Sequence, residues 1–192
     1  MKEISETIIS LNNPPDQDAR RFMSEEIQFR DILPRWISKI CSVKFKAALQ
    51  MYFDYLQAHI QKLESLFEDE KIPTGDIKSR FMLAFIEKTN EKLSHYYDGQ
   101  IRDIYLLTRV QSIIHFKISS YGAAASFANA LNMKKYGAVF YDAEVNEQNI
   151  CDRLSQLAEP EINSQAVLSH GKVRIGLFPS FQNASKCYGH NQ

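Results

Sequence analysis

The feature that most constrains the fold is a series of long segments in which apolar residues recur every three or four positions. This spacing places apolar side chains along one face of an α-helix, so each segment predicts an amphipathic helix. Five helices are expected, over residues 17–41, 43–70, 76–96, 100–131 and 134–158. Most of the 7 glycines and 6 prolines lie outside these segments. Long helices joined by short links predict an all-α fold, an antiparallel bundle.

The chain divides into three parts around this helical region. Residues 1–16 end in the cluster Asn12-Asn13-Pro14-Pro15-Asp16, which breaks helices and predicts a flexible N-terminal arm. Residues 17–159 form the predicted bundle. Residues 160–192 begin at Pro160 and lack helical periodicity, so they are expected to form an extended, non-helical tail. Within the first helix, Pro34 is expected to introduce a kink or to divide the helix.

Composition argues against several classes of function. Lys plus Arg and Asp plus Glu each number 23, and no basic stripe stands out, so a nucleic-acid partner is not expected. The apolar runs are too short to span a bilayer, and the acidic start MKEISETIIS does not match a signal peptide. Three widely spaced cysteines argue against a disulfide framework. These observations favour a cytoplasmic protein without a membrane association.

Polar residues interrupt the apolar stripes of three predicted helices. Glu26 lies on the stripe of the first helix, Asn146 lies on that of the last, and Lys117 lies on or beside the stripe of the fourth. An inward-facing Lys117 would need an acidic partner, which could be Glu26, with Asp142 or Glu147 as further candidates, because an unpaired buried charge is costly. Alternatively, Ile118 is the inward residue, and the Lys117 side chain extends along the surface to water.

Four sequence blocks carry a resemblance to a known family. They read LPRWISKIC from residue 33, LQAHIQKLESLF from residue 56, HFKISSYGAAASFANAL from residue 115 and EQNICDRLSQLAE from residue 147. In order and spacing, the region from about residue 20 to 159 resembles the YciE/YciF family of ferritin-like bundles. The resemblance implies a ferritin-like antiparallel four-helix bundle with an additional helix, a link to stress, and a homodimer.

The resemblance also implies the remnant of a metal site, since ferritin-like bundles hold two metal ions with carboxylates and histidines. The residues implied as vestigial ligands are Glu26, Asp54, His59, His115, Asp142 and Glu147. The family has acids on both sides of its His-aromatic pair, where this chain has Ile114 and Lys117. It also has a run of acids on the last helix, where this chain has Asn146. Half of the ligand set is therefore missing, and Lys117 is interpreted as a charge substitute for the metal.

Two functions are compatible with these residues. The first is a non-catalytic ferritin-like bundle with a degenerate dimetal site, no cofactor, and a structural or protein-interaction role, possibly a stress-related one. The alternative is an iron- or manganese-binding protein that retains a partial carboxylate and histidine site with oxidoreductase or storage activity. A non-catalytic role is favoured over an enzyme, because the Lys117 ammonium would repel a metal cation beside it. For the expected homodimer, the small residues 122–125 and the tail are candidate surfaces.

Overall fold

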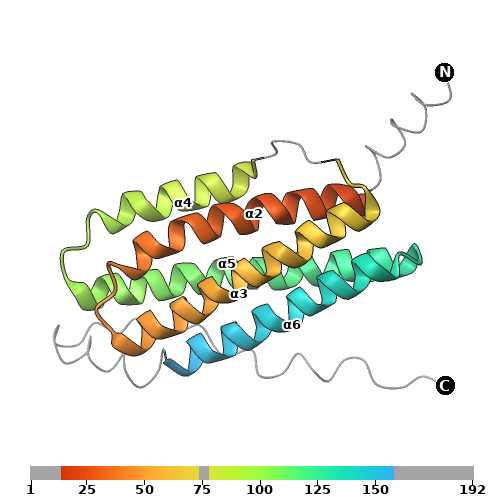
Figure 1. The fold of residues 1–192 in the computed structure, drawn as a ribbon. Coiled ribbons are helices and arrows are strands. Elements are labelled where there is room, and N and C mark those ends of the chain that lie inside the picture. Colours follow the sequence, from red (N-terminus) through yellow and green to blue (C-terminus); the bar gives the residue numbers. More distant parts are fainter. Residues whose placement is uncertain (1–13, 74–77, 158–192) are drawn as a thin grey trace, which may run out of the picture.

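The computed structural model describes residues 14–73 and 78–157, which form five helices (Figure 1). The helices are α2 (Pro14–Ile37), α3 (Val43–Glu70), α4 (Arg80–Leu93), α5 (Gly99–Ala130) and α6 (Lys134–Leu157). No strand is found within these residues, so the predicted all-α fold is confirmed. The predictions for residues 1–13 and for the tail from residue 160 onward lie outside the described residues.

The four long helices make two antiparallel hairpins, α2 with α3 and α5 with α6, which pack side by side (Figure 1). Helix α2 contacts α3 and α5, and α6 contacts α3 and α5. The shorter α4 runs back along α2, so that α5 starts at the opposite end of the bundle from the end of α3. This is the predicted four-helix bundle with an additional helix. Among the described helices, none combines the length and apolarity that a bilayer span needs.

Local capping explains where three of the helices begin. The Ser42 hydroxyl accepts a hydrogen bond from the Phe45 N–H, and the Asp98 carboxylate accepts from the N–H groups of residues 100 and 101. The Ser79 hydroxyl caps α4 in the same way, which places its start at Arg80 rather than at residue 76. Such side chains satisfy N–H groups that have no partner within the helix.

The first helix differs from its prediction at both ends. It begins at Pro14, three residues earlier than expected, and its Asp16 carboxylate accepts a hydrogen bond from the hydroxyl of Tyr136 in α6. It is not divided at Pro34 but runs through it and ends three residues later, at Ile37. Only one turn follows the proline, so little of the helix depends on the hydrogen bond that its missing N–H cannot make.

The core consists of two apolar clusters that follow one another along the bundle. One cluster contains Phe29, Leu56, Ile114 and Cys151, and the other contains Phe22, Leu63, Tyr121 and Ala143, each with further apolar neighbours. Each of the four long helices contributes to both clusters. At the border between the clusters, the same helices bury the polar residues Glu26, His59, Lys117 and Glu147. These four residues therefore form a polar layer between two apolar clusters.

Two expectations about helix faces need correction. On α4, which lies in the 76–96 segment whose apolar periodicity includes Phe81, the buried positions are Met82, Thr89 and Leu93, whereas Phe81 is 45% exposed. On α5 the small residues 122–125 are only partly free, since Ala124 and Ala125 are buried and a Cβ atom on Gly122 would lie 2.7 Å from Oε1 of Glu144 in α6, whereas Ala123 is exposed. These small residues allow α6 to pack closely against α5 within the chain.

Candidate functional site

A lysine ammonium lies at the centre of the polar layer. Lys117 on α5 is 2% exposed, and its Nζ lies 2.9 Å from Oε1 and 3.0 Å from Oε2 of Glu26 on α2. The same Nζ forms an ion pair with Glu147 on α6 and donates a hydrogen bond to Oη of Tyr52 on α3, at 3.0 Å. An ammonium has three N–H donors. Here they have three partners, one from each of the other long helices.

Two tyrosine hydroxyls complete the hydrogen bonding of the two carboxylates. Tyr52 donates to Oε2 of Glu147 at 2.6 Å, and Tyr121 donates to Oε1 of Glu26 at 2.5 Å. All four side chains are at most 1% exposed. Burial of a carboxylate is tolerable only when its oxygens are hydrogen bonded and its charge is balanced, and both conditions are met here.

His59 of α3 borders this network on one side. Its Nδ1 lies 3.4 Å from Oε1 of Glu26 and 3.5 Å from Oη of Tyr121, and its ring stacks on Tyr55 with 5.8 Å between ring centroids. The ring is 2% exposed. Its Nε2 atom, like the Tyr55 hydroxyl, has no hydrogen-bond partner among the described residues.

The surroundings shift the protonation equilibria of the two acids in opposite directions. Burial by itself raises the pKa of Glu26, but the Lys117 ammonium and the hydrogen bonds from His59 and Tyr121 outweigh it and lower the pKa to about 2. For Glu147, burial outweighs the attraction of Lys117, the Glu26 charge adds to the effect, and the pKa is raised. Glu26 is therefore the more firmly ionised of the two carboxylates.

The basic and phenolic groups keep their protons. Burial lowers the pKa of Lys117, but the charges of Glu147 and Glu26 overcome this and raise it above its ordinary value. Burial and the same two carboxylates raise the pKa values of Tyr52 and Tyr121 well above the ordinary range. Lys117 thus remains a cation, and the two tyrosines remain hydrogen-bond donors.

Of the predicted vestigial ligands, Glu26, His59 and Glu147 lie in the polar layer, where His59 contacts Glu26 and Lys117 stands between Glu26 and Glu147. The other three lie outside the polar layer. Asp54 is exposed and accepts from Gln50, Asp142 is exposed and pairs with Lys62, and His115 is exposed with Nε2 3.5 Å from the Cys151 sulfur.

Helix geometry explains this separation. Asp54 and His115 each lie two residues from an inward side chain, which is about 200° around a helix, and Asp142 lies five residues from Glu147, which is about 140°.

The expected ion pair between Lys117 and Glu26 is present, and Glu147 rather than Asp142 is the second acid. Lys117 is therefore the inward residue, while Ile118 is only partly buried.

The donor set does not fit a metal centre. In the described part of the chain, no three His, Cys, Asp or Glu side chains converge where they could hold a metal ion. Three of the four carboxylate oxygens of Glu26 and Glu147 contact the ammonium, and the fourth accepts from Tyr52. The position between the acids is filled by the nitrogen of Lys117.

Sequence reasoning did not assign a role to Tyr52 or Tyr121. Both were visible as tyrosines on apolar stripes, and Tyr121 follows Lys117 by four residues, which places the two on one face of α5. That spacing indicates an inward hydroxyl that needs a partner, but it does not identify Glu26 and Glu147 on other helices.

Comparison with known proteins places this fold in a family. A family model described as "Domain of unknown function (DUF892)" matches residues 20–167. The chain belongs to this family. Protein YciF of Escherichia coli strain K12 is 24% identical to it over 144 residues, which are 74% of this chain and 87% of YciF. The predicted resemblance to the YciE/YciF family is thereby confirmed, and the chain is a divergent member of it.

Two solved structures share the DUF892 fold. The crystal structure of the E. coli stress protein YciF superposes with a TM-score of 0.72 at 21% identity, covering 78% of this chain and 94% of that one. The structure of YcfI from Rhodopseudomonas palustris superposes with a TM-score of 0.69 at 17% identity, covering 72% and 88%. At these identities the superpositions establish the shared architecture of the bundle.

Proposed function

We propose that this protein is a non-catalytic ferritin-like bundle in which the Lys117 ammonium takes the place of a metal centre. The single observation behind the proposal is that Nζ of Lys117 bonds to Glu26, Tyr52 and Glu147 in a buried layer between the two apolar clusters. In this position the ammonium supplies a positive charge to the acids and joins all four long helices. Its role is structural, and it stabilises a scaffold that presents its outer surface to other proteins.

A role in the stress response is part of this proposal, because the E. coli relative YciF is described as a stress protein. No redox or hydrolytic step is assigned to the chain. The alternative of a partial iron or manganese site has one observation in its favour, the buried Nε2 of His59, which has no partner among the described residues. A single imidazole nitrogen beside an ammonium is a poor metal site, because the two cations repel each other.

Metal analysis of the purified protein tests the proposal. Protein expressed in medium rich in iron and manganese and purified without chelator is expected to contain far less than one metal ion per chain by plasma emission spectrometry. The Lys117→Glu variant serves as the comparison, because it removes the cation and adds a third carboxylate between Glu26 and Glu147. Two transition-metal ions per wild-type chain would contradict the proposal.

A further inference from the structure

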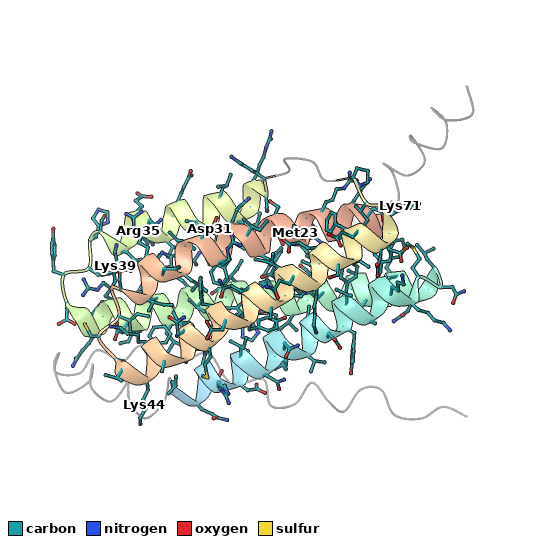
Figure 2. The ribbon with its side chains drawn as sticks, viewed as in Figure 1. Met23, Asp31, Arg35, Lys39, Lys44 and Lys71 are labelled. Carbon is teal, nitrogen blue, oxygen red and sulfur yellow. The ribbon has the colours of Figure 1, made fainter. Side chains whose placement is uncertain are left out.

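One end of the bundle gathers basic side chains that the overall composition conceals. The turn between α2 and α3 and the turn between α4 and α5 both lie at this end, where Figure 2 shows Arg35, Lys39 and Lys44. Residues 35–46 and 94–102 contain one acid and five basic residues, which are Arg35, Lys39, Lys44, Lys46 and Arg102. The whole chain has 23 charges of each sign, so this excess of positive charge is local.

The two acids at the start of α5 are already engaged within the protein. The Asp98 carboxylate caps α5 by accepting from the N–H groups of residues 100 and 101. The buried Asp103 carboxylate accepts from the N–H groups of Cys41 and Ser42, at 3.0 and 2.7 Å. By contrast, three of the basic side chains form no ion pair within the described residues, namely Arg35, Lys39 and Lys46. Their charges are therefore free to attract an anionic partner.

Helix stability does not account for the lysines at the start of α3. Lys44 and Lys46 lie among its first four residues, and Glu68, Asp69 and Glu70 are its last three. The helix dipole favours acids at the start of a helix and bases at its end, so both placements oppose it. The same placements put positive charge at one end of the bundle and negative charge at the other (Figure 1).

Two apolar side chains project from the basic end. Tyr97, in the turn before α5, is 93% exposed, and Val43, the first residue of α3, is 81% exposed. No other large hydrophobic side chain in the described part of the chain is exposed to this extent. The turns that carry them are held in place, since Nε of Arg102 in α5 donates to the Lys39 carbonyl at 3.1 Å. This end therefore combines positive charge with projecting apolar groups.

From these features we propose that the end formed by residues 35–46 and 94–102 docks on an anionic bilayer surface. Clustered lysines and arginines are attracted to anionic headgroups, and tyrosine favours the interface between headgroups and hydrocarbon. Two separate projecting side chains suit a bilayer, whereas a folded protein partner needs a continuous apolar patch. Attachment to a surface needs no spanning helix, so this proposal revises the expectation of a protein without membrane association. It is independent of the role proposed for Lys117.

Cosedimentation of the full-length protein with vesicles tests this docking. Vesicles of phosphatidylcholine with about 30% phosphatidylglycerol should bind at least about tenfold more tightly than phosphatidylcholine alone, and salt should weaken the binding. Lys39→Gln with Lys46→Gln should weaken it about thirtyfold, because two charges leave the docked surface. Lys134→Gln with Lys135→Gln makes the same charge change at the opposite end, at the start of α6, and should change affinity less than about twofold.

A fluorescent reporter locates the contact. The Tyr97→Trp variant should shift its emission to shorter wavelength with anionic vesicles and be quenched by brominated lipid, whereas the buried Trp36 of the wild type should not respond. Thermal melts should coincide for the wild type and both double variants, since none of the four lysines is buried.

Three results would overturn the proposal. The first is equal binding to neutral and anionic vesicles, and the second is equal affinity of the two double variants for anionic vesicles. The third is binding of poly-L-glutamate or duplex DNA in the absence of vesicle binding, which would assign the basic end to an acidic polymer.

Discussion

At the scale of single residues, the buried Lys117 ammonium forms ion pairs with two buried carboxylates, those of Glu26 and Glu147. Lys117 has lost its hydration, and the loss is offset because all three N–H donors have oxygen partners and two of these partners are charged. Lys62 and Asp142 also pair an ammonium with a carboxylate, 3.3 Å apart, but both side chains are more than half exposed to water. The two lysines therefore provide a direct comparison of a buried and an exposed ion pair.

Removal of the buried ammonium should destabilise the protein strongly. Lys117→Ala leaves two buried carboxylates without a cation and is expected to lower the free energy of unfolding by about 3–5 kcal/mol. Lys62→Ala is expected to cost less than about 1 kcal/mol, because water screens the surface pair. Urea denaturation of both variants measures the difference. Similar small losses for the two lysines would show that Lys117 contributes no more than a surface charge.

Removing the acids together with the lysine should restore stability. Lys117→Met with Glu26→Gln and Glu147→Gln eliminates all three charges and keeps side chains of similar size. We expect the triple variant to lose less free energy of unfolding than Lys117→Met alone, since no charge is left buried without a partner. A triple variant whose loss equals the sum of the three single losses would indicate that the three groups act independently.

The pH dependence of stability should report the ionisation of Glu26. Its pKa is about 2 in the folded protein and near 4.5 when unperturbed. The unfolded chain therefore binds more protons between these values, so stability falls as the pH is lowered from 4.5 toward 2. The contribution is about 3 kcal/mol, fully present above pH 4.5. The gap in unfolding free energy between wild type and Glu26→Gln should close over this range, and a gap independent of pH would contradict the assignment.

At the scale of helices, α4 is attached to α2 by the hydrogen bond from Trp36 Nε1 to Asn90 Oδ1 at one point and by Ser79 at another. Ser79 donates from its hydroxyl to Oε1 of the buried Glu25 at 3.0 Å, caps the Met82 N–H, and donates from its backbone N–H to Ser24 at 2.9 Å. Burial raises the pKa of Glu25 despite the nearby Arg21 guanidinium. Ser79 therefore both begins α4 and provides a hydrogen bond to an acid that water does not reach.

Replacement of this serine should cost more than the loss of an ordinary cap. Ser79→Ala is expected to lower the free energy of unfolding by about 2–3 kcal/mol, since it removes the cap and a partner of Glu25. Ser42→Ala removes the cap of α3 and should cost about 1 kcal/mol, because among the described residues the Ser42 hydroxyl has only the Phe45 N–H as partner. Chemical denaturation compares the two variants. Equal losses would mean that the bond to Glu25 contributes nothing.

At the scale of the whole molecule, the described helices bury their apolar faces against one another. Several large apolar side chains are not buried in this way and lie on the outer surface. Among these, Tyr141 and Val145 are four residues apart on the outer face of α6 and are 58% and 40% exposed. Of the residues 122–125, which are a candidate contact between subunits, Ala124 and Ala125 are buried and Gly122 packs against Glu144 of α6, while Ala123 is exposed. A homodimer, which we still expect, would have to use an outer face such as this one.

Sedimentation equilibrium tests the expected dimer. The full-length protein should sediment with twice the 22.2 kDa mass of one chain. Replacement of both Tyr141 and Val145 by lysine should shift it toward that monomer mass, because like charges would face each other across a symmetric contact. Thr108→Lys, at an exposed position on α5, controls for the added charge. A wild-type protein that sediments as a monomer at micromolar concentration would contradict the expectation.

The sequence by itself determined the all-α architecture, the five helical segments and the two unusual charges, Glu26 and Lys117. These properties depend on the periodicity of apolar residues within one helix, which short stretches of chain already contain. The bounds predicted for α3, residues 43–70, agree with the structure to the residue, in which Ser42 caps the start and Lys71, with φ of 53°, ends the helix.

Only the tertiary structure decided which groups meet. Lys117 and Ile118 differ by about 100° around α5, and both are compatible with the apolar stripe, so helix packing had to select the inward one. Glu26 and Glu147 lie 91 and 30 residues from Lys117, and nothing in the local sequence sets the axial register between their helices. The same register turns Asp54, His115 and Asp142 to the surface. Pairing across helices depends on rotation and axial shift, which the periodicity of a single helix does not specify.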